Sequence, residues 1–233
     1  MSQTELLLVH GWGLGSGFWR PMLQGAQDLP QTHLVDLGFF HKQGEPRQPQ
    51  PEGSWIGVGH SMGALWLLRA LQGDEPGLDA ETKDNCQGLI FINGFSRFAR
   101  AEGFPSGVHN RVIQRMRDRL PEDTDKVLRD FAQRSGMPEM PPVSLLKPHV
   151  ERLDWGLEGL QQWDGREVLA RWERPFAALA TRDDAIVTEA MSRSLFQEST
   201  DGVTWLDHGG HLLPLTQGEA VASHIQTCLE QWS

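Results

Sequence analysis

The sequence is poor in cysteine, in net positive charge and in long apolar runs, and each shortage excludes a class of protein. Its 233 residues hold two cysteines, Cys86 and Cys228, too far apart for a disulfide framework or a metal-ligand spacing, which is typical of a reducing compartment. A formal net charge of −10 disfavours nucleic-acid binding, because phosphate contacts need a basic surface. The run Leu6–Val9 is too short for a signal peptide or membrane span. We therefore expect a cytoplasmic protein with no nucleic-acid or membrane partner.

The sequence does contain short apolar runs that alternate with helical patterns. Apolar residues make up 39% and charged residues 22%, which is typical of one globular domain with a large core. Continuous apolar runs suit strands buried on both faces of a parallel sheet. These runs are Leu6–Val9, His33–Val35, Trp55–Val58, Leu89–Ile92, Phe176–Ala180 and Val203–Leu206. Helices are expected at Met62–Leu71, Glu189–Phe196 and Glu219–Trp232. This order predicts an α/β fold with a mostly parallel, doubly wound sheet.

Two stretches interrupt the alternation. Residues 41–53 are rich in proline, glutamine and glycine and predict a loop. From about residue 95 to residue 172 only helical patterns occur, at Arg111–Leu120, Thr124–Arg134 and Leu153–Trp163, with a proline-rich hinge at Met137–Pro142. We expect this insertion to form a helical lid where ligands bind, at the carboxyl ends of the strands. The chain then divides into a core of residues 1–94 and 173–233 and a lid of residues 95–172.

The strand expected at Trp55–Val58 leads directly into residues 59–63, which read Gly-His-Ser-Met-Gly. This is a G-x-S-x-G pattern, in which a tight strand-to-helix turn lifts the serine hydroxyl to the top of the sheet at a helix N-terminus. Gly59 and Gly63 remove side chains that would clash in that turn. We expect Ser61 to be a nucleophile. The alternative is a glycine-rich turn with an incidental serine.

The first strand is followed by residues 10–13, which read His-Gly-Trp-Gly. A glycine at position 11 lets the backbone turn so that the Trp12 N–H faces Ser61. Together with the Met62 N–H it would form an oxyanion hole, usually the largest electrostatic contribution in acyl transfer. The alternative is a plain turn at the end of a strand.

In a fold with this serine turn, the acid lies between the serine and the histidine in chain order. Asp183 and Asp184 both follow the strand Phe176–Ala180. We favour Asp184, because it directly precedes residues 185–187, which lead into the next helix. Asp183 is expected to cap a turn or face solvent.

The base is expected after the last strand, where His211 follows two glycines that let a loop carry its ring over Ser61. His208 is interpreted as loop structure, and His60 as pocket lining. His208 and His211 have a metal-like spacing but no third ligand, so no metal is expected. His211 would take the Ser61 proton while Asp184 holds the imidazole tautomer.

Further stretches carry a more specific pattern. They are His10–Leu14 with Trp19 and Arg20, Val35–Leu37, Phe98–Pro105, and Gly156–Leu160 with Asp164 and Arg166. In these the chain resembles the pimeloyl-acyl-carrier-protein methyl ester carboxylesterases of biotin synthesis. The resemblance implies an α/β-hydrolase fold and removal of a methyl ester from an acyl chain on an acyl carrier protein. His60 and Ala64 stand where that family commonly has Trp and Gly.

The expected lid is basic in an acidic chain. Residues 97–134 include nine basic and six acidic residues, a balance of +3. Two interpretations stay open: solvated helices of mixed charge, or a surface that docks an acidic carrier protein. The docking residues would be Arg111, Arg115, Lys126 and Arg129.

Substrate contacts are expected from Trp12, Met62, Phe131 and His211. The first candidate function is a serine carboxylesterase acting on an acyl or methyl ester. A thioesterase, or a carbon–carbon hydrolase or lyase, would use the same triad. The third candidate function is that of a ligand-binding protein without useful turnover, and the complete Ser–Asp–His set argues against it. We expect a monomer without a cofactor.

Overall fold

The centre of the molecule is a six-stranded parallel sheet. A computed structural model describes residues 4–26, 28–40, 46–73, 78–137, 147–196 and 202–232. The strand order is β2-β1-β3-β4-β5-β6, and all neighbouring pairs are parallel. The strands are β1 (Glu5–Val9), β2 (Thr32–Val35), β3 (Trp55–His60), β4 (Cys86–Ile92), β5 (Phe176–Thr181) and β6 (Val203–Leu206). The predicted α/β fold with a doubly wound sheet is confirmed.

Helices follow every strand except β2, after which the described residues hold no helix before β3. The loop predicted at residues 41–53 lies outside the described residues at 41–45, and residues 46–53 form neither a helix nor a strand. The helices are α1 (Arg20–Gly25), α2 (Met62–Gln72), α3 (Ala80–Asp84), α4 (Asn110–Arg119), α5 (Thr124–Arg134), α7 (Val150–Gln162), α8 (Arg166–Ala170), α9 (Glu189–Arg193), α10 (Leu213–Thr216) and α11 (Gly218–Gln231). The helix predicted at residues 189–196 is divided into α9 and a 3-10 turn at Ser194–Phe196. The short helices α1, α3, α8 and α10 have four to six residues, too few to show a helical period in the sequence.

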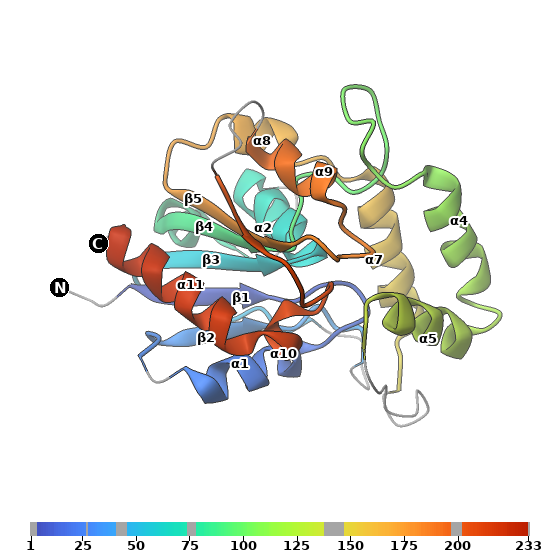
Figure 1. Cartoon of the computed structure of the whole chain (residues 1–233), viewed down its shortest axis with the longest axis horizontal. Helices are drawn as coiled ribbons and strands as arrows, with labels where there is room; N and C mark the ends of the chain where they lie inside the picture. The colour runs from blue at the N-terminus through green and yellow to red at the C-terminus, as the bar shows by residue number, and fades with distance from the viewer. Residues whose placement is uncertain are drawn as a thin grey trace.

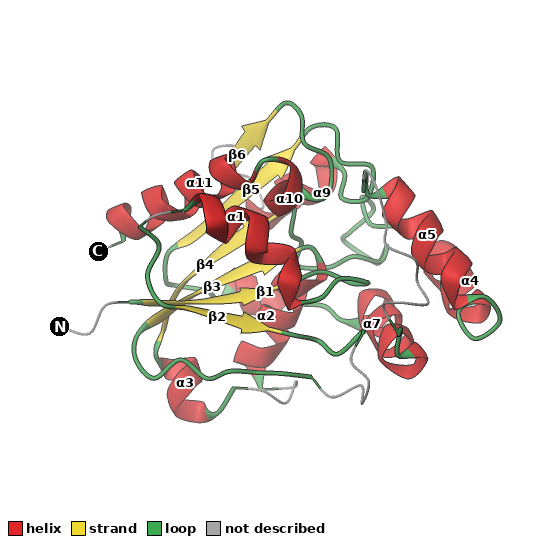
Figure 2. Cartoon of the chain, turned by 90° about the horizontal axis from the view of Figure 1, so that it is seen from below, coloured by secondary structure: helices red, strands yellow, loops and turns green. Residues whose placement is uncertain are grey.

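Helices cover both faces of the sheet, as Figures 1 and 2 show. Helices α1 and α11 pack against the face on which Leu6 and Leu8 of β1 are buried. Helix α2 packs against the opposite face, where Leu7 and Val9 are buried. Successive strand residues point to opposite faces, so a strand covered on both sides needs apolar side chains throughout. This is why the run at β1 is continuous rather than alternating.

The segment between β4 and β5, residues 95–172, is here called the β4–β5 insertion. It contains α4, α5, α7 and α8, and its described residues form no strand, only isolated bridges such as that between Arg97 and Asp164. Helices α4, α5 and α7 lie beyond the carboxyl ends of the strands, at the side of the molecule opposite both termini (Figure 1). Arg117 of α4 donates to Asp154 of α7 at 2.8 Å and joins these two helices. The hinge expected at residues 137–142 lies outside the described residues, except for Met137.

The strand order reverses at β1, which pairs with β2 on one side and β3 on the other. In open α/β sheets, ligands bind beyond the carboxyl ends of the strands at such a reversal. The loops after β1 and β3 are the ones that carry Trp12 and Ser61. The topology therefore brings these two residues to the same edge of the sheet.

Both cysteines are buried and unpaired. Burial raises the pKa of the Cys86 thiol to about 12 and that of Cys228 to about 11, so neither is a thiolate at neutral pH. None of the helices in the described ranges has the length and apolar character needed to cross a membrane. The expected cytoplasmic location stays a prediction.

The first turn of α2 lies directly against the end of β1. A Cβ atom added at Gly63 would be 2.1 Å from the carbonyl oxygen of Val9, and one added at Gly59 would be 2.5 Å from the backbone of Ala64. Contacts this short with backbone atoms cannot be relieved by rotating a side chain. Glycine is therefore required at both positions of the strand-to-helix turn.

We predict that Gly63→Ala destabilises the protein by about 1–3 kcal/mol or more, since an overpacked site forces the backbone to move. The free energy of unfolding in urea would measure this. Gly25→Ala is the matched control, because a Cβ atom at Gly25 meets no atom within 4 Å. An equal loss in both variants would contradict the proposed close approach of α2 to β1.

Candidate active site

Ser61 occupies the turn between β3 and α2 in a strained backbone conformation. Its φ of 53° and ψ of −122° lie in a region that residues with a side chain seldom adopt. The Ser61 N–H donates to the carbonyl of Ile92 at 3.1 Å, and the Ser61 carbonyl accepts from the N–H of Ala64 at 3.0 Å. These two bonds connect the turn to β4 on one side and to the first turn of α2 on the other. The sequence pattern predicts this geometry, which is that of a nucleophile elbow.

The structure brings Ser61, His211 and Asp184 into one chain of hydrogen bonds. His211 Nε2 lies 3.0 Å from Ser61 Oγ, and His211 Nδ1 lies 2.8 Å from Asp184 Oδ2. An ionised carboxylate only accepts, so the ring carries its proton on Nδ1 and Nε2 can accept the Ser61 proton. The side chains of His211 and Asp184 are each 1% exposed, so water competes little for these bonds.

The two neighbouring aspartates have different partners. Asp184 Oδ1 accepts from the backbone N–H groups of residues 186 and 187, at 2.7 and 2.9 Å, which leaves Oδ2 for His211. Asp183 accepts from the N–H groups of residues 209 and 210, at 3.2 and 2.9 Å. Burial raises the pKa of Asp183, but hydrogen bonds from the two N–H groups, from its own backbone and from Thr181 together lower it more, so its pKa lies below the ordinary value. Asp184 therefore contacts the imidazole, and Asp183 holds the turn before it.

The two N–H groups expected to form an oxyanion hole belong to Trp12 and Met62. Met62 is the first residue of α2. A Cβ atom at Gly11 would lie 3.0 Å from Ser61 Cβ, so the loop that carries Trp12 lies against the serine turn. Neither N–H has a hydrogen-bond acceptor within the ranges that the structure describes. Both donors are therefore available to a ligand beside a helix N-terminus, which favours negative charge.

The Trp12 side chain is anchored to the β4–β5 insertion. Its Nε1 donates to the carbonyl of Leu153 in α7 at 2.8 Å. Its ring packs edge-to-face with Phe131 of α5, with ring centroids 4.9 Å apart. Gly156 permits the approach of α7, because a Cβ atom there would lie 2.6 Å from the Trp12 ring. The residue that offers an N–H beside Ser61 is thus held by two helices of the insertion.

An apolar cavity lies between Trp12 and the insertion. It is lined by Trp12, Phe98, Val108, Val112, Ile113, Met116, Phe131, Arg134, Leu157, Leu160 and Ile186. Arg134 is the one charged residue in this set. Of the residues predicted to contact substrate, Trp12 and Phe131 line the cavity, and Phe131 also faces His211 with ring centroids 6.5 Å apart. The Met62 side chain is fully buried in the core, so only its backbone is placed to meet a ligand.

Two residues near His211 have roles that the sequence did not indicate. His60, which the sequence suggested as pocket lining, is fully buried between Phe18 and His211. Asn93 is 1% exposed and donates to the backbone carbonyls of residues 210 and 211. The sequence signal that could have identified Asn93 is its position as a polar residue directly after the strand Leu89–Ile92.

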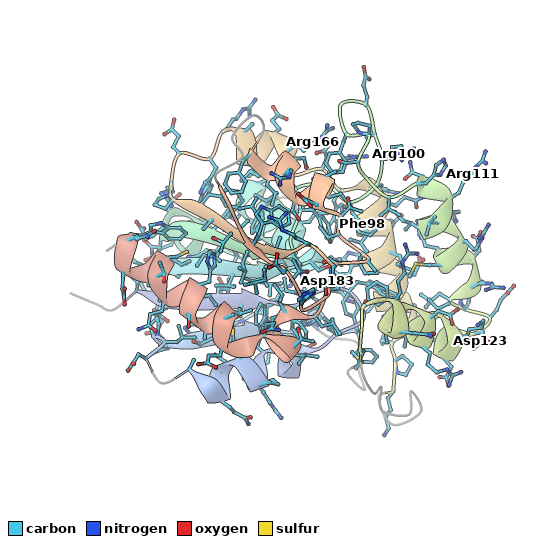
Figure 3. The ribbon with its side chains drawn as sticks, in the orientation of Figure 1. Phe98, Arg100, Arg111, Asp123, Arg166 and Asp183 are labelled. Carbon is cyan, nitrogen blue, oxygen red and sulfur yellow. The ribbon has the colours of Figure 1, made fainter. Side chains whose placement is uncertain are left out.

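The remaining candidate residues lie at the surface. His208 is 87% exposed and lies 3.8 Å from Asp183. Asp183 itself is near the centre of the view in Figure 3, beyond the ends of the strands, whereas Arg111 projects from the outer side of α4. Lys126 pairs with Asp130 at 3.2 Å and Arg129 with Asp125 at 3.4 Å, each within α5. Arg111 and Arg115 of α4 are exposed and make no ion pair with any described residue.

We predict that Asp184→Asn slows the reaction of Ser61 with a fluorophosphonate by on the order of 10³–10⁴-fold, because the imidazole loses the partner that fixes its tautomer. Asp183→Asn is the matched control and should have a much smaller effect, since the amide oxygen can still accept the shorter of the two bonds, from the N–H group of residue 210, and Asp183 does not contact the imidazole of His211. Labelling rates measured by mass spectrometry would test the pair, and the reverse ranking would contradict the assignment.

Comparison with known proteins agrees with this geometry. The model of the alpha/beta hydrolase family matches residues 6–224. A pimeloyl-[acyl-carrier protein] methyl ester esterase of Stenotrophomonas maltophilia is 27% identical over 247 residues, which cover 95% of this chain and 91% of that protein. A bifunctional biotin biosynthesis protein of Cellvibrio japonicus is 26% identical over 217 residues, which cover 84% of this chain and 41% of that protein. The resemblance predicted from the sequence is confirmed.

Solved structures show the same fold at lower identity. An esterase from Exiguobacterium antarcticum superposes with a TM-score of 0.77 and 14% identity, over 98% of this chain and 92% of that one. A bromoperoxidase from Bacillus anthracis superposes with a TM-score of 0.76 and 17% identity, over the same shares of the two chains. Because the family model spans nearly the whole chain and the fold agrees, this protein belongs to the alpha/beta hydrolase family.

Proposed function

We propose that this protein is a serine carboxylesterase that hydrolyses an acyl or methyl ester. The hydrogen-bond chain from Asp184 through His211 to Ser61 carries the proposal, because it pairs a hydroxyl with a base whose tautomer is fixed. The names of the relatives support it, since several are methyl ester esterases. Ser61 is the nucleophile, His211 the base and Asp184 the orienting acid.

The mechanism follows from the positions of these atoms. His211 Nε2 takes the proton of Ser61 Oγ as the oxygen attacks the ester carbonyl, and the N–H groups of Trp12 and Met62 stabilise the oxyanion. The imidazolium gives its proton to the leaving alcohol, which leaves an acyl group on Ser61. A water molecule then attacks the acyl group, with His211 again as base, and releases the acid. Asp184 stays ionised and stabilises the imidazolium in both steps.

The apolar cavity suits the acyl part of such a substrate. Trp12 and Phe131 form walls of the cavity and also lie beside Ser61 or His211. An acyl chain placed there would contact apolar side chains almost throughout, with about 25 cal/mol gained for each Å² of apolar surface removed from water. In this proposal Trp12, Met62, Phe131 and His211 contact the substrate, Met62 through its backbone.

The finer proposal is a methyl ester on a pimeloyl chain held by an acyl carrier protein, in biotin biosynthesis. Relatives named for that substrate align with 91–92% of their length. In this proposal residues 95–172 form a lid, since their helices line the acyl cavity and hold Trp12. A carrier protein is acidic, and residues 97–134 of the lid, which include α4 and α5, have a balance of +3 in a chain of −10.

The charges of the lid favour α4 as the docking helix. Arg111 and Arg115 are one helical turn apart, exposed, and without an ion pair to any described residue. Lys126 and Arg129 form ion pairs with acids of α5, which reduces their attraction for an acidic carrier protein. A groove between α4 and α5 is lined by apolar residues, by Asp130 and by three arginines, Arg115, Arg119 and Arg134, and it shares lining residues with the acyl cavity. A carrier docked on α4 would thus lie close to the route into the cavity.

We predict that the protein hydrolyses short p-nitrophenyl esters and that Ser61→Ala abolishes this activity, because the nucleophile is absent. A fluorophosphonate should label the wild-type chain once, at Ser61. A thioesterase or carbon–carbon hydrolase would show labelling but prefer another substrate, and a ligand-binding protein would show no turnover. Rescue of a biotin-requiring strain that lacks its methyl ester esterase, by wild type but not by Ser61→Ala, tests the finer substrate.

We predict that the double reversal Arg111→Glu/Arg115→Glu raises KM for a carrier-bound methyl ester about tenfold, since long-range attraction speeds the encounter. Turnover of a small free ester should stay unchanged, and added salt should narrow the gap between variant and wild type. The control Lys83→Glu/Arg174→Glu changes the net charge equally, but Lys83 lies in α3 before β4 and Arg174 lies just before β5, at the opposite edge of the sheet and outside residues 95–172. Equal effects of the two pairs would contradict docking on α4.

A further inference from the structure

The loop that carries His211 is not held by regular secondary structure. Residues 207–212 belong to no helix or strand, and two glycines within them adopt positive φ, 140° at Gly209 and 62° at Gly210. Such a segment has many backbone conformations available, because glycine tolerates both signs of φ. The position of the imidazole therefore depends on contacts from other elements.

Side chains at the ends of three neighbouring strands, β3, β4 and β5, supply these contacts. The carbonyl of His211 accepts from His60 Nε2 at 2.8 Å and from Asn93 Nδ2 at 3.1 Å. Asn93 Nδ2 also donates to the Gly210 carbonyl at 2.9 Å, and Thr181 Oγ1 donates to that same carbonyl at 3.0 Å. Both carbonyls beside the imidazole thus accept two hydrogen bonds each.

Asn93 itself is held in place from two directions. Its Oδ1 accepts from the backbone N–H of Thr181 at 3.0 Å, which fixes which end of the amide faces the His211 loop. Its φ of 43° is in the left-handed region, which asparagine tolerates better than most residues. The side chain cannot turn over without losing three hydrogen bonds in a buried site. The amide N–H groups of Asn93 are therefore held facing the carbonyls of residues 210 and 211.

His60 is a donor of fixed protonation. Its Nε2 faces a carbonyl and must carry the proton, while its Nδ1 is buried without a hydrogen-bond partner among the described residues. Burial first, and then the neighbouring His211 charge, hold the pKa of His60 well below its ordinary value. His60 therefore stays neutral while His211 gains and loses a proton beside it, with the ring centroids 4.9 Å apart.

We propose that His60 and Asn93 are positioning residues that hold the catalytic imidazole by its own backbone carbonyl. Strand β3 ends at His60, directly before Ser61, and His60 pairs in register with Ile92, directly before Asn93. The nucleophile and the support of its base are thus on one rigid edge of the sheet. A catalytic role for this support rests on the proposed function, whereas its effect on the placement of the ring does not.

Three variants test the hydrogen bonds separately from packing. His60→Leu removes the donor, and His60→Gln places an amide N–H near the Nε2 position. Asn93→Asp keeps the shape and the acceptor for Thr181 but sets a carboxylate oxygen against two carbonyls. Trp66→Phe is the control, because it alters a buried side chain of α2 whose Nε1 has no hydrogen-bond partner among the described residues.

For a p-nitrophenyl ester we expect kcat to fall on the order of 100-fold in His60→Leu and Asn93→Asp, with little change in KM, since a small displacement of a catalytic group has effects of that size. His60→Gln should recover most of the loss, and Trp66→Phe should match wild type. The second measurement needs no substrate: the downfield proton NMR signal of the His211 Nδ1–H, which should be sharp in wild type and His60→Gln and broadened or lost in the other two.

The results separate this proposal from the proposed function. Loss of the NMR signal in His60→Leu and Asn93→Asp, with recovery in His60→Gln, supports the positioning of His211 by these residues. This holds even if the wild type hydrolyses no ester, and in that case only the proposed function fails. If His60→Leu and Asn93→Asp both have the NMR signal and the rates of the wild type, the proposal that these residues position His211 is overturned. Equal losses in Trp66→Phe would overturn it as well, because they would trace to general destabilisation.

Discussion

The contact between the first turn of α2 and the carboxyl end of β1 is the constraint on which the site depends. At Gly63 the two backbones approach so closely that a single added carbon atom would lie 2.1 Å from the Val9 carbonyl. This approach sets the N-terminus of α2 beside the loop that carries Trp12. It also leaves Ser61 only a strained conformation, with φ of 53°. The burial of apolar side chains on both faces of the sheet stabilises the fold enough to offset the energy of that strain.

A serine held rigidly can act as the proposed nucleophile only if the proposed base, His211, is equally well placed, and the parallel sheet makes this possible. All strands end at one edge, so side chains that follow β3, β4 and β5 can reach a common loop. His60, Asn93 and Asp183 come from these three ends, and between them they satisfy polar backbone groups of residues 209–211. Hydrogen bonds made in advance of the reaction need no rearrangement in the transition state, which is the basis of electrostatic preorganisation.

The β4–β5 insertion adds an apolar wall and a charge pattern to this edge. Trp12 connects the two parts: its loop lies against the serine turn, and its indole donates to the Leu153 carbonyl of α7. The edge-to-face packing of Trp12 on Phe131 contributes about 0.5–1.5 kcal/mol beyond the area it buries. The opposite side of the insertion carries the arginines of α4. One short insertion therefore provides an apolar face toward the core and a basic face toward solvent.

The sequence by itself determined the features that are local in the chain. Apolar runs predict the strands, the Gly-x-Ser-x-Gly pattern predicts the turn at Ser61, and the two aspartates differ in what directly follows them, because these signals lie within a few residues of each other. Only the tertiary structure decided what holds His211, since His60 lies 151 residues from it and Asn93 118 residues from it. Hydrogen bonds across such separations leave no period or spacing to detect. Likewise, the charges of the β4–β5 insertion can be counted in the sequence, but which of its basic residues pair with neighbouring acids depends on side-chain geometry in the folded helices.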